Sequence, residues 1–420
     1  MKHVVIIGNS AAGISAAESI RKSDSQLKIT VISEEKGMPY YRYRIADILS
    51  ARAKESDIVF KRPEFYSAHN IQLILGKKAE KVNTAKNFVV LSDKTKVEYD
   101  GLIVASGMTA NMSKEIKGIN KHGVLGFRTI DNIRDILELI PITRTVCVLG
   151  SGIPALKAAT ALSQKGMEVK IICRDDFLLP DILDPQAAEF FQSYFQERNV
   201  EVLLKRDIVE IFGNGDVKAI KTDAGKVIGC GIVIIERDFV AQVSFLEDSG
   251  VKCENGIEVD KFLCTSCPNV FAAGDVIQRR GIGRFYSWNT SLAQGEIAAR
   301  NIINQLQGRQ EEMVAYQPAS EWPTQAAEFF GLSLVCLGVT SSPAAENKEE
   351  MVFSDKSRNV YKKAVISNAR LVGFLGVGTL PDEKEIYSRL ISTQADISLI
   401  KNDLLSERLT PDLVKDLAQP

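Results

Sequence analysis

The stretch KHVVIIGNSAAG, residues 2–13, decides the fold of this chain. An apolar strand, Lys2–Ile7, leads into the glycine turn Gly8–Gly13, and a helix is expected over Ile14–Lys22. A second apolar strand, Lys28–Ile32, follows and ends in an acidic sequence. This order of strand, turn, helix, strand and acid is that of a βαβ unit that binds a dinucleotide.

The residue types of this turn suit a pyrophosphate. Gly8 permits the tight turn, the small Ser10 lets backbone NH groups approach the phosphates, and Gly13 lets the helix pack on the strand. Ser10 stands where a second glycine is usual, and an acid after the second strand can hold a ribose hydroxyl. An ordinary strand-turn-helix corner would leave that acid unexplained. The predicted contacts are Gly8, Ser10, Ala11, Ala12, Gly13, Glu34 and Glu35.

The same pattern recurs at Thr145–Ala155, so the chain is expected to hold two dinucleotides. Val146–Leu149 is the predicted strand, Leu156–Lys165 the helix and Glu168–Cys173 the next strand. No carboxylate follows that strand before Asp175, so the ribose-binding position differs from the first copy. The predicted contacts of the second unit are Gly150, Gly152, Ile153, Pro154 and Arg174.

Length, composition and net charge narrow the possible classes of protein. With 420 residues, 45% hydrophobic and 25% charged, the chain is long enough for two or three globular domains. The net charge of -1 provides no overall field that would attract nucleic acid or an anionic membrane. The apolar run Val4–Ile7 is too short for a secretory signal or a membrane span, so we expect a cytoplasmic protein. The candidate domain boundaries are Asn111–His122, Arg309–Pro318 and Thr340–Glu350.

Cysteines and histidines offer little for metal or thiol chemistry. The seven cysteines are an odd number, which favours reduced thiols over a disulfide framework. Cys264 and Cys267 alone form a CxxC, and in an extended segment their side chains would point to opposite faces. We therefore favour structural cysteines over a redox or metal pair. The three histidines lie outside every motif, so no metal site and no catalytic side chain is predicted.

Two more segments have the form of a buried strand that ends in a small-residue turn: Tyr99–Gly107, and Asn269–Asp275 with an acid at its tip. Together with the two glycine turns they resemble the pyridine-nucleotide-dependent flavoprotein oxidoreductases, the glutathione-reductase-like superfamily. The resemblance implies that the first unit holds FAD and that Asp275 hydrogen-bonds the ribityl chain. It also implies FAD contacts at Ala79, Ala105, Ser106, Gly107 and Gly274.

Within that superfamily, the segment Met38–Arg44 is informative. No cysteine lies between Met1 and Cys147, which excludes a redox-active cysteine in the first flavin-binding segment. The Tyr-Arg-x-Arg string resembles NADH:rubredoxin oxidoreductases and the flavin domain of nitrite reductases. This resemblance implies that Arg42 contacts the FAD pyrophosphate, and that the helix beginning at Trp288 and Asn289 points its N-terminus at the flavin.

The second unit departs from the family pattern at four places: Pro154, Lys157, Cys173 and the segment Ile235–Phe239. Arg174 beside the missing acid suits a 2'-phosphate and hence NADPH, although Asp175 could still hold a ribose. Alternatively the nucleotide site is degenerate, and electrons reach FAD from a partner protein.

The fold class expected is α/β, with two Rossmann-like three-layer dinucleotide-binding domains and a small α+β C-terminal domain. The FAD-binding domain is predicted over 1–110 and 240–310, the NAD(P)-binding-like domain over 111–239, and the C-terminal domain over 318–420. In the last, a hairpin of Tyr361–Ile366 and Arg370–Gly378 precedes a helix over Asp382–Ile391. The helical tail Asp396–Leu417 mixes both charge signs, so it is expected to pack on protein rather than on a membrane.

These features predict an FAD-dependent NAD(P)H oxidoreductase that exchanges electrons with an iron-sulfur or rubredoxin-type protein, in a direction that the sequence does not set. The flavin supplies the chemistry, so the protein needs no catalytic side chain of its own. The alternative is a non-catalytic or partner-fed flavin subunit with a degenerate NAD(P) site. A homodimer and a subunit of a larger complex are both compatible with the sequence.

Overall fold

The computed structural model describes residues 1–112, 115–278, 287–317, 325–340, 348–379, 381–406 and 408–415. Parts of all three candidate boundary segments, residues 113–114, 318 and 341–347, lie outside this range. The chain divides into two compact units. The first consists of Met1–Ile45, Ala53–Asn111 and Asp238–Ala319, and the second of Ala46–Arg52, Met112–Arg237 and Ser320–Pro420.

The first unit is built on a parallel five-stranded sheet in the order β19-β7-β1-β2-β3. The strands are β1 His3–Ile7, β2 Lys28–Ile32, β3 Ile71–Ile74, β7 Gly101–Val104 and β19 Val270–Ala272. Most of their residues are buried, because alternate side chains enter two different hydrophobic clusters. The sheet is therefore the middle layer of this unit.

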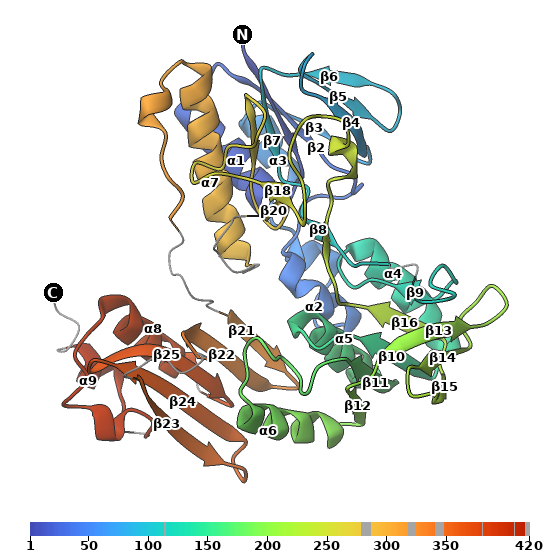
Figure 1. Ribbon diagram of the computed structural model, residues 1–420, viewed down its shortest axis with the longest axis vertical. Helices are drawn as coiled ribbons and strands as arrows, with labels where there is room; N and C mark the ends of the chain where they lie inside the picture. The colour runs from blue at the N-terminus through green and yellow to red at the C-terminus, as the bar shows by residue number, and fades with distance from the viewer. Residues whose placement is uncertain are drawn as a thin grey trace. The chain divides into compact units, whose positions relative to one another are not determined.

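The outer layers of the first unit differ in kind. Helices α1 (Ala11–Ser23) and α7 (Trp288–Leu306) lie side by side on one face of the parallel sheet (Figure 1). A three-stranded antiparallel sheet contributes to the cluster on the other face. Its strands are β4 Ala79–Asn83, β5 Phe88–Leu91 and β6 Lys96–Glu98. Small residues allow the two helices to approach: a Cβ at Gly295 would lie 2.2 Å from the carbonyl oxygen of Ala12.

The second unit contains another parallel five-stranded sheet, in the order β12-β11-β10-β16-β9. Helix α5 (Ile153–Gln164) packs on β10 and β11, α6 (Pro185–Gln196) on β12, and α4 (Ile130–Leu139) on β9. The strands are β9 Val124–Leu125, β10 Thr145–Leu149, β11 Glu168–Cys173, β12 Val200–Leu204 and β16 Ile232–Ile235. A small antiparallel sheet follows, of β13 Ile208–Phe212, β14 Ala219–Thr222 and β15 Val227–Gly229.

The C-terminal part of the second unit is an antiparallel sheet, β21-β22-β25-β24-β23, with α8 (Pro381–Thr393) packed on β22 and β25. The aromatic rings of Phe374 and Tyr387 stack between sheet and helix, with centroids 3.5 Å apart. The strands are β21 Gln325–Phe329, β22 Leu332–Gly338, β23 Lys348–Asp355, β24 Val360–Ser367 and β25 Arg370–Val377.

The C-terminal tail corrects one expectation. Over the predicted Asp396–Leu417, of which residues 407, 416 and 417 lie outside the described range, only Lys401–Asp403 and Pro411–Lys415 are helical. Buried apolar side chains nonetheless attach the tail to the cluster beneath α8, so it packs on protein as predicted. These side chains are Ile397, Ile400, Leu404, Leu405, Leu409 and Val414.

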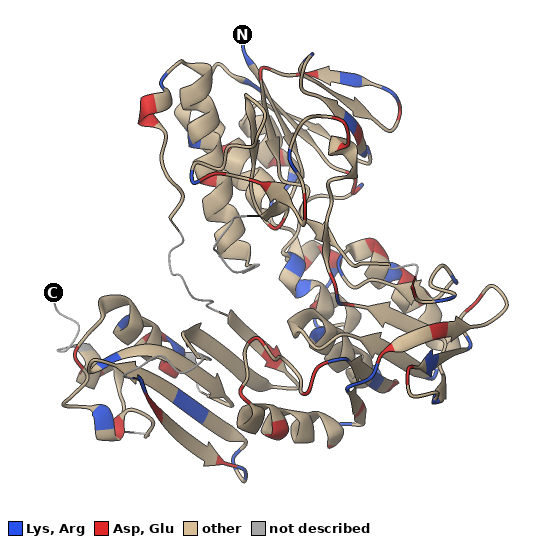
Figure 2. Ribbon diagram, in the orientation of Figure 1, with Lys and Arg blue, Asp and Glu red and all other residues tan. Residues whose placement is uncertain are grey.

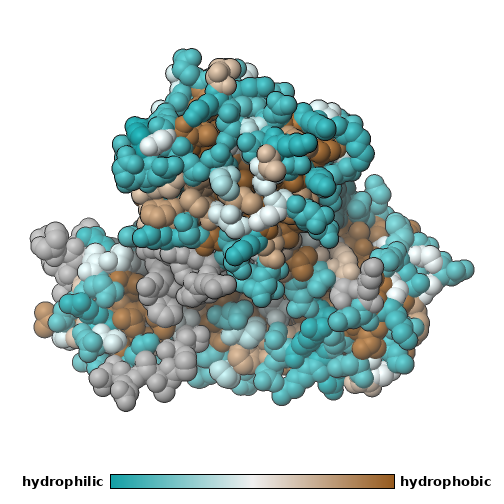
Figure 3. Space-filling model, turned by 45° about the horizontal axis from the view of Figure 1, so that its top comes forward, coloured by the Kyte–Doolittle hydropathy of each residue, from teal (hydrophilic) through white to brown (hydrophobic). Residues whose placement is uncertain are grey.

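The expected fold class, α/β with two parallel dinucleotide-type sheets and a smaller α+β part, is confirmed. Lysines and arginines are interspersed with acidic residues throughout both units (Figure 2). On the face shown in Figure 3, apolar residues form separate areas among hydrophilic ones. None of the helices in the described residues combines the length and the apolar character that a membrane span requires.

Candidate functional site

The first glycine turn is held by the strands around it. The backbone NH of Gly8 donates to the carbonyl of Ile32 at 2.9 Å, which ties the turn to the end of β2. Gly8 has a φ of +120°, and a Cβ there would lie 2.1 Å from the carbonyl oxygen of Ala105 at the end of β7. Only glycine fits this position. The ends of three neighbouring strands therefore meet at this turn.

Helix α1 begins at Ala11, directly after the turn, rather than at the predicted Ile14. Ser10 is the N-cap, but its side chain caps no backbone NH, and the first turn contains no acid. Gly13 packs so closely that a Cβ would lie 1.9 Å from the Gly8 carbonyl oxygen. The helix thus presents first-turn NH groups without a side-chain cap, which is the arrangement that binds phosphate.

The acid-tipped turn after β19 lies against the same helix. The NH of Gly274 donates to the side chain of Gln294 at 2.8 Å, and a Cβ at Gly274 would lie 3.0 Å from that of Ala12. Ser291 donates its hydroxyl hydrogen bond to Asp275 Oδ1 at 3.4 Å. Both partners belong to α7, so this helix positions Gly274 and Asp275 beside the N-terminus of α1.

Arg42 and one of the two predicted acids form a pair. Arg42 Nη2 lies 2.7 Å from Glu35 Oε1, and the hydroxyl of Tyr40 donates to Glu35 Oε2 at 2.5 Å. Burial lowers the pKa of Arg42, but Tyr40, Glu35 and Asp275 outweigh it and raise the pKa above its usual value. Glu34 is more exposed and lies 3.6 Å from Lys78. Arg42 is therefore a fixed cation in the same electrostatic field as Asp275.

The remaining predicted contacts of this unit lie at different depths. Ala105 contacts the Gly8 turn, and Ser106 donates its hydroxyl hydrogen bond to the carbonyl of Gln242 at 2.7 Å. Gly107 has a φ of +72°. Ala79 is buried in the cluster on the β4-β5-β6 side, whereas Ala105 belongs to the cluster on the helix side. The structure thus brings Ala105 to the turn and places Ala79 on the other face of the sheet.

An aromatic group around Trp288 is a feature that sequence reasoning missed. Its ring lies 5.1 to 5.7 Å, centroid to centroid, from those of Tyr41, Tyr43 and Phe60. The sequence feature that could have indicated this aromatic group is the string of three tyrosines around Arg42. Ser287 caps α7 by accepting from the NH of Thr290 at 3.0 Å, and Asn289 is exposed.

A second missed residue is Tyr66, whose hydroxyl donates to Asn9 Oδ1 inside the glycine turn at 2.6 Å. Nothing in its sequence context marks it. It supports the turn from α3 (Pro63–Ala68).

The second glycine turn repeats the backbone arrangement of the first. The NH of Gly150 donates to the carbonyl of Ile172 at 3.0 Å, its φ is +144°, and a Cβ would lie 2.3 Å from the Glu236 carbonyl oxygen. Gly152 is the N-cap of α5, again without a side-chain cap. Pro154 is the second helical residue, where proline is tolerated but offers no NH. One phosphate donor is therefore missing compared with the first unit.

The side chains after the second turn are engaged with one another. Ser151 donates its hydroxyl hydrogen bond to Asp175 Oδ2 at 2.5 Å, so the acid one step late in sequence still reaches the turn. Arg174 lies 2.6 Å from Asp207, which also holds Arg237 at 2.8 Å. One carboxylate therefore pairs with two arginines. Burial raises the pKa of Cys173, at the unit's missing acid position, to about 11.

Two departures from the family pattern are ionisable side chains whose pKa is shifted by burial. Glu236, directly after β16, is 2% exposed, and burial raises its pKa to about 7 against the influence of Arg128 and the Phe127 NH. Burial likewise lowers the pKa of Lys157 on α5, where Asp47 and Glu328 oppose the shift. In the first unit, the residue whose carbonyl contacts the glycine turn is the uncharged Ala105.

The CxxC does not form a joint site. Cys264 packs against the cluster on the α1 and α7 side, and Cys267 against the cluster on the opposite side. Both are free thiols, as are the other five cysteines. Among the described residues no three or more His, Cys, Asp or Glu side chains are grouped to hold a metal.

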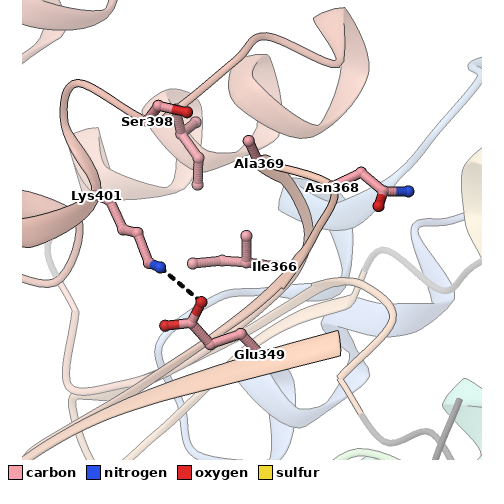
Figure 4. Close-up of a pocket in the computed structure, with 7 residues that line it drawn as sticks. Glu349, Ile366, Asn368, Ala369, Ser398 and Lys401 are labelled. Atoms are coloured by element: carbon pink, nitrogen blue, oxygen red, sulfur yellow. Dashed lines mark hydrogen bonds and ion pairs between the residues drawn. The ribbon is translucent and has the colours of Figure 1, made fainter. Parts of the chain in front are cut away.

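Neither of the two described cavities is lined by residues of the glycine turns. One, of about 370 Å³ in the C-terminal part of the chain, is crossed by an ion pair between Lys401 and Glu349 at 2.6 Å (Figure 4). The other, of about 470 Å³, lies at the start of β1 and the end of α7. The candidate site is therefore defined by the turns and their neighbours.

The sequence is similar to those of known proteins. The model of the pyridine nucleotide-disulphide oxidoreductase family matches residues 2–295. The chain is 26% identical over 418 residues to the assimilatory nitrate reductase electron transfer subunit of Bacillus subtilis, covering 99% of this chain and 52% of that protein. It is 24% identical over 412 residues to the NADH-rubredoxin oxidoreductase of Clostridium acetobutylicum, covering 96% of this chain and 99% of that one.

Solved structures show the same fold. Putidaredoxin reductase, in a covalent complex with putidaredoxin, matches with a TM-score of 0.83 at 20% identity over 99% of each chain. The chain spans about half the length of the nitrate reductase subunit and nearly all of the rubredoxin oxidoreductase.

Proposed function

Because the chain belongs to the pyridine nucleotide-disulphide oxidoreductase family, we propose that it is an FAD-dependent NAD(P)H oxidoreductase. In the proposed reaction it transfers electrons between a nicotinamide nucleotide and an iron-sulfur or rubredoxin-type protein. The names of its relatives, an electron transfer subunit and an NADH-rubredoxin oxidoreductase, support this class of partner.

The observation that carries the proposal is the first glycine turn. Helix α1 presents first-turn NH groups without a side-chain cap, and the turn before it admits only glycine at position 8, because a Cβ there would collide with the Ala105 carbonyl oxygen. Asp275 and Arg42 share one electrostatic field beside that helix. A pyrophosphate has two negative charges, and helix NH groups with a guanidinium suit it. These residues fit FAD, with Asp275 available to accept from a ribityl hydroxyl.

FAD, when bound, supplies the hydride and single-electron chemistry. The chain's residues hold and orient the cofactor: α1 its phosphates, Arg42 the pyrophosphate charge, Asp275 the ribityl chain. No cysteine precedes Cys147 in sequence, and Cys147 is fully buried in β10 of the other unit. We therefore propose that electrons pass between nucleotide and carrier through the flavin, with no thiol intermediate at the flavin.

For the second turn we propose a nicotinamide nucleotide, and NADH in preference to NADPH. Asp175 reaches the turn through Ser151, where it can accept from a ribose hydroxyl and would repel a 2'-phosphate. Asp207 partly neutralises Arg174, which weakens the attraction that its position alone predicts for a phosphate.

A second candidate function is a flavin subunit that receives its electrons from a partner protein. Three observations favour it: Pro154 removes an NH from the α5 N-terminus, and burial shifts the pKa of both Lys157 and Glu236 toward the neutral form. In that case the second unit keeps its fold without binding a nucleotide.

Anaerobic titration of the FAD-loaded protein with NADH and with NADPH separates the two functions. We expect NADH to bleach the flavin absorbance and NADPH to do so more slowly. A matched pair of variants locates the effect. Gly150→Ala places a Cβ 2.3 Å from a carbonyl oxygen, and it should abolish bleaching while FAD is retained. In the control Gly229→Ala the new Cβ meets only one atom, at 4.0 Å, and bleaching should be the same as in wild type. A flavin that neither nucleotide reduces would refute the reductase and support the partner-fed subunit.

A further inference from the structure

Glu236 is a buried acid in contact with the second glycine turn. It follows β16 directly and is 2% exposed. Its backbone NH donates to the carbonyl of Leu149, the last residue of β10, at 2.8 Å, and its carbonyl oxygen lies against Gly150. The backbone of Glu236 therefore packs against the turn.

The side chain of Glu236 is only half satisfied. Oε1 accepts from the backbone NH of Phe127 at 2.6 Å, which fixes the segment between β9 and α4. Oε2 is buried and has no hydrogen-bond partner among the described residues. An ionised carboxylate normally accepts several hydrogen bonds, so this environment suits the neutral acid.

Several charged residues lie near Glu236 or the turn that it contacts. Arg128, next to Phe127, favours the carboxylate form. Arg237, the next residue in sequence, is paired with Asp207. On the turn itself, Asp175 accepts from Ser151. Because burial raises the pKa of Glu236 to about 7, both its forms are present at neutral pH and a small change in local charge shifts the balance.

We propose that Glu236 is a positioning residue that couples proton uptake to the binding of a dinucleotide at the Gly150 turn. The inference rests on the proposed function, because it requires a nucleotide in the second unit. A pyrophosphate at the N-terminus of α5 brings negative charge to the turn against which the Glu236 carbonyl lies. That charge disfavours the carboxylate, so Glu236 takes one proton from solvent, and no other bond changes.

The direction of the pH effect follows from linkage. Below pH 6 the acid is already protonated, and binding requires no proton. Above pH 7 each bound nucleotide must also recruit a proton, so affinity falls by at most about tenfold per pH unit. We expect the dissociation constant to rise by about 3- to 10-fold between pH 6.5 and 8.

Calorimetric titration of the FAD-loaded protein with NAD⁺ tests this. NAD⁺ does not reduce the flavin, and it lacks the 2'-phosphate of NADP⁺, which itself titrates near pH 6. Repeating the titration in two buffers of different ionisation enthalpy counts the protons taken up directly. Wild type should take up a fraction of a proton at pH 7.5, with weaker binding at pH 8 than at pH 6.5.

Glu236→Gln keeps the shape and the acceptor for the Phe127 NH but cannot titrate. It should bind NAD⁺ with the same affinity at both pH values and take up no proton. Glu138→Gln, an exposed acid on α4, is the matched control and should behave as wild type. If the variant at 236 keeps the pH dependence, or wild type binds NAD⁺ equally at all pH values, the inference is overturned and the proposed function stands. If NAD⁺ does not bind at any pH, both the inference and the proposed nucleotide-binding function are refuted.

Discussion

The glycine turns at Gly8 and Gly150 have nearly the same backbone and very different neighbours. In each, the glycine NH bonds to the adjacent strand, a Cβ would collide with a carbonyl, and the following helix has no side-chain cap. The carbonyl belongs to a small residue, Ala105, in the first unit and to the buried acid Glu236 in the second. The backbone alone therefore forms the same turn twice, and we propose that each turn is a phosphate cradle whose neighbouring side chains decide which charge and which nucleotide it accepts.

The largest effect is expected from removing the first cradle. Gly8→Ala places a Cβ 2.1 Å from the Ala105 carbonyl oxygen in a backbone conformation that alanine rarely adopts. We expect loss of bound FAD and a loss of about 3 kcal/mol or more in the stability of the first unit. Flavin absorbance after desalting and thermal unfolding measure both. Gly37→Ala, which has no atom within 4 Å of its Cβ, should keep its flavin. FAD retained in Gly8→Ala would mean that the two turns are not equivalent cradles.

The next largest effect is the pH dependence of the folding stability of the second unit. The pKa of Glu236 is raised by burial from 4.5 to about 7 in the folded protein. A raised pKa means that the folded state holds the proton more tightly, so this stability is complete below pH 4.5 and is lost as pH rises to 7. The loss should reach about 3 kcal/mol in wild type and be absent in Glu236→Gln. Thermal unfolding of both proteins at pH 5, 6, 7 and 8 measures this loss. If the stability of wild type and of Glu236→Gln changes with pH in parallel, the prediction is wrong.

The sequence predicted the strands of both units well, because apolar runs between turns have few other structures. The strands Lys28–Ile32 and Glu168–Cys173 have the predicted bounds. Both helices begin three residues earlier than predicted, at Ala11 and Ile153, because the last residues of each turn already adopt helical geometry. A proline at position 154 looked like a departure in the turn, yet it lies in the first helical turn, where its fixed φ is compatible.

The sequence alone could not predict the surroundings of the charged side chains that directly follow β11 and β16. An acid that follows a strand is usually solvated, and only the fold places Phe127 and Gly150 around Glu236. The same holds for Asp207, which lies 33 residues from Arg174 in sequence and pairs with it in space. The position of Arg174 suggested a phosphate ligand, and its partner was invisible to any local pattern.

A moderate effect is expected at Arg42, the cation that pairs with Glu35 in the first unit. Arg42→Met removes the partner of Glu35 and the proposed contact to the pyrophosphate, while keeping most of the apolar stem. We expect FAD affinity to fall by about 2 kcal/mol, close to 30-fold. Arg62→Met, an exposed arginine of the same unit, is the control. Equal flavin affinities in the two variants would contradict a role for Arg42 in cofactor binding.

The smallest effect concerns nucleotide choice in the second unit, where one carboxylate holds two arginines. Asp207→Asn removes the charge that neutralises Arg174 and Arg237 without removing either cation. A 2'-phosphate should then gain about 0.5–1 kcal/mol, or roughly 2- to 5-fold in affinity, because the pair is partly exposed and screened by solvent. Binding of NADP⁺ relative to NAD⁺ measures the change, and the double variant Asp207→Asn with Arg174→Met should cancel it. If NADP⁺ gains nothing from Asp207→Asn, then Asp175 at the turn, and not the arginine pair, sets the preference for NADH.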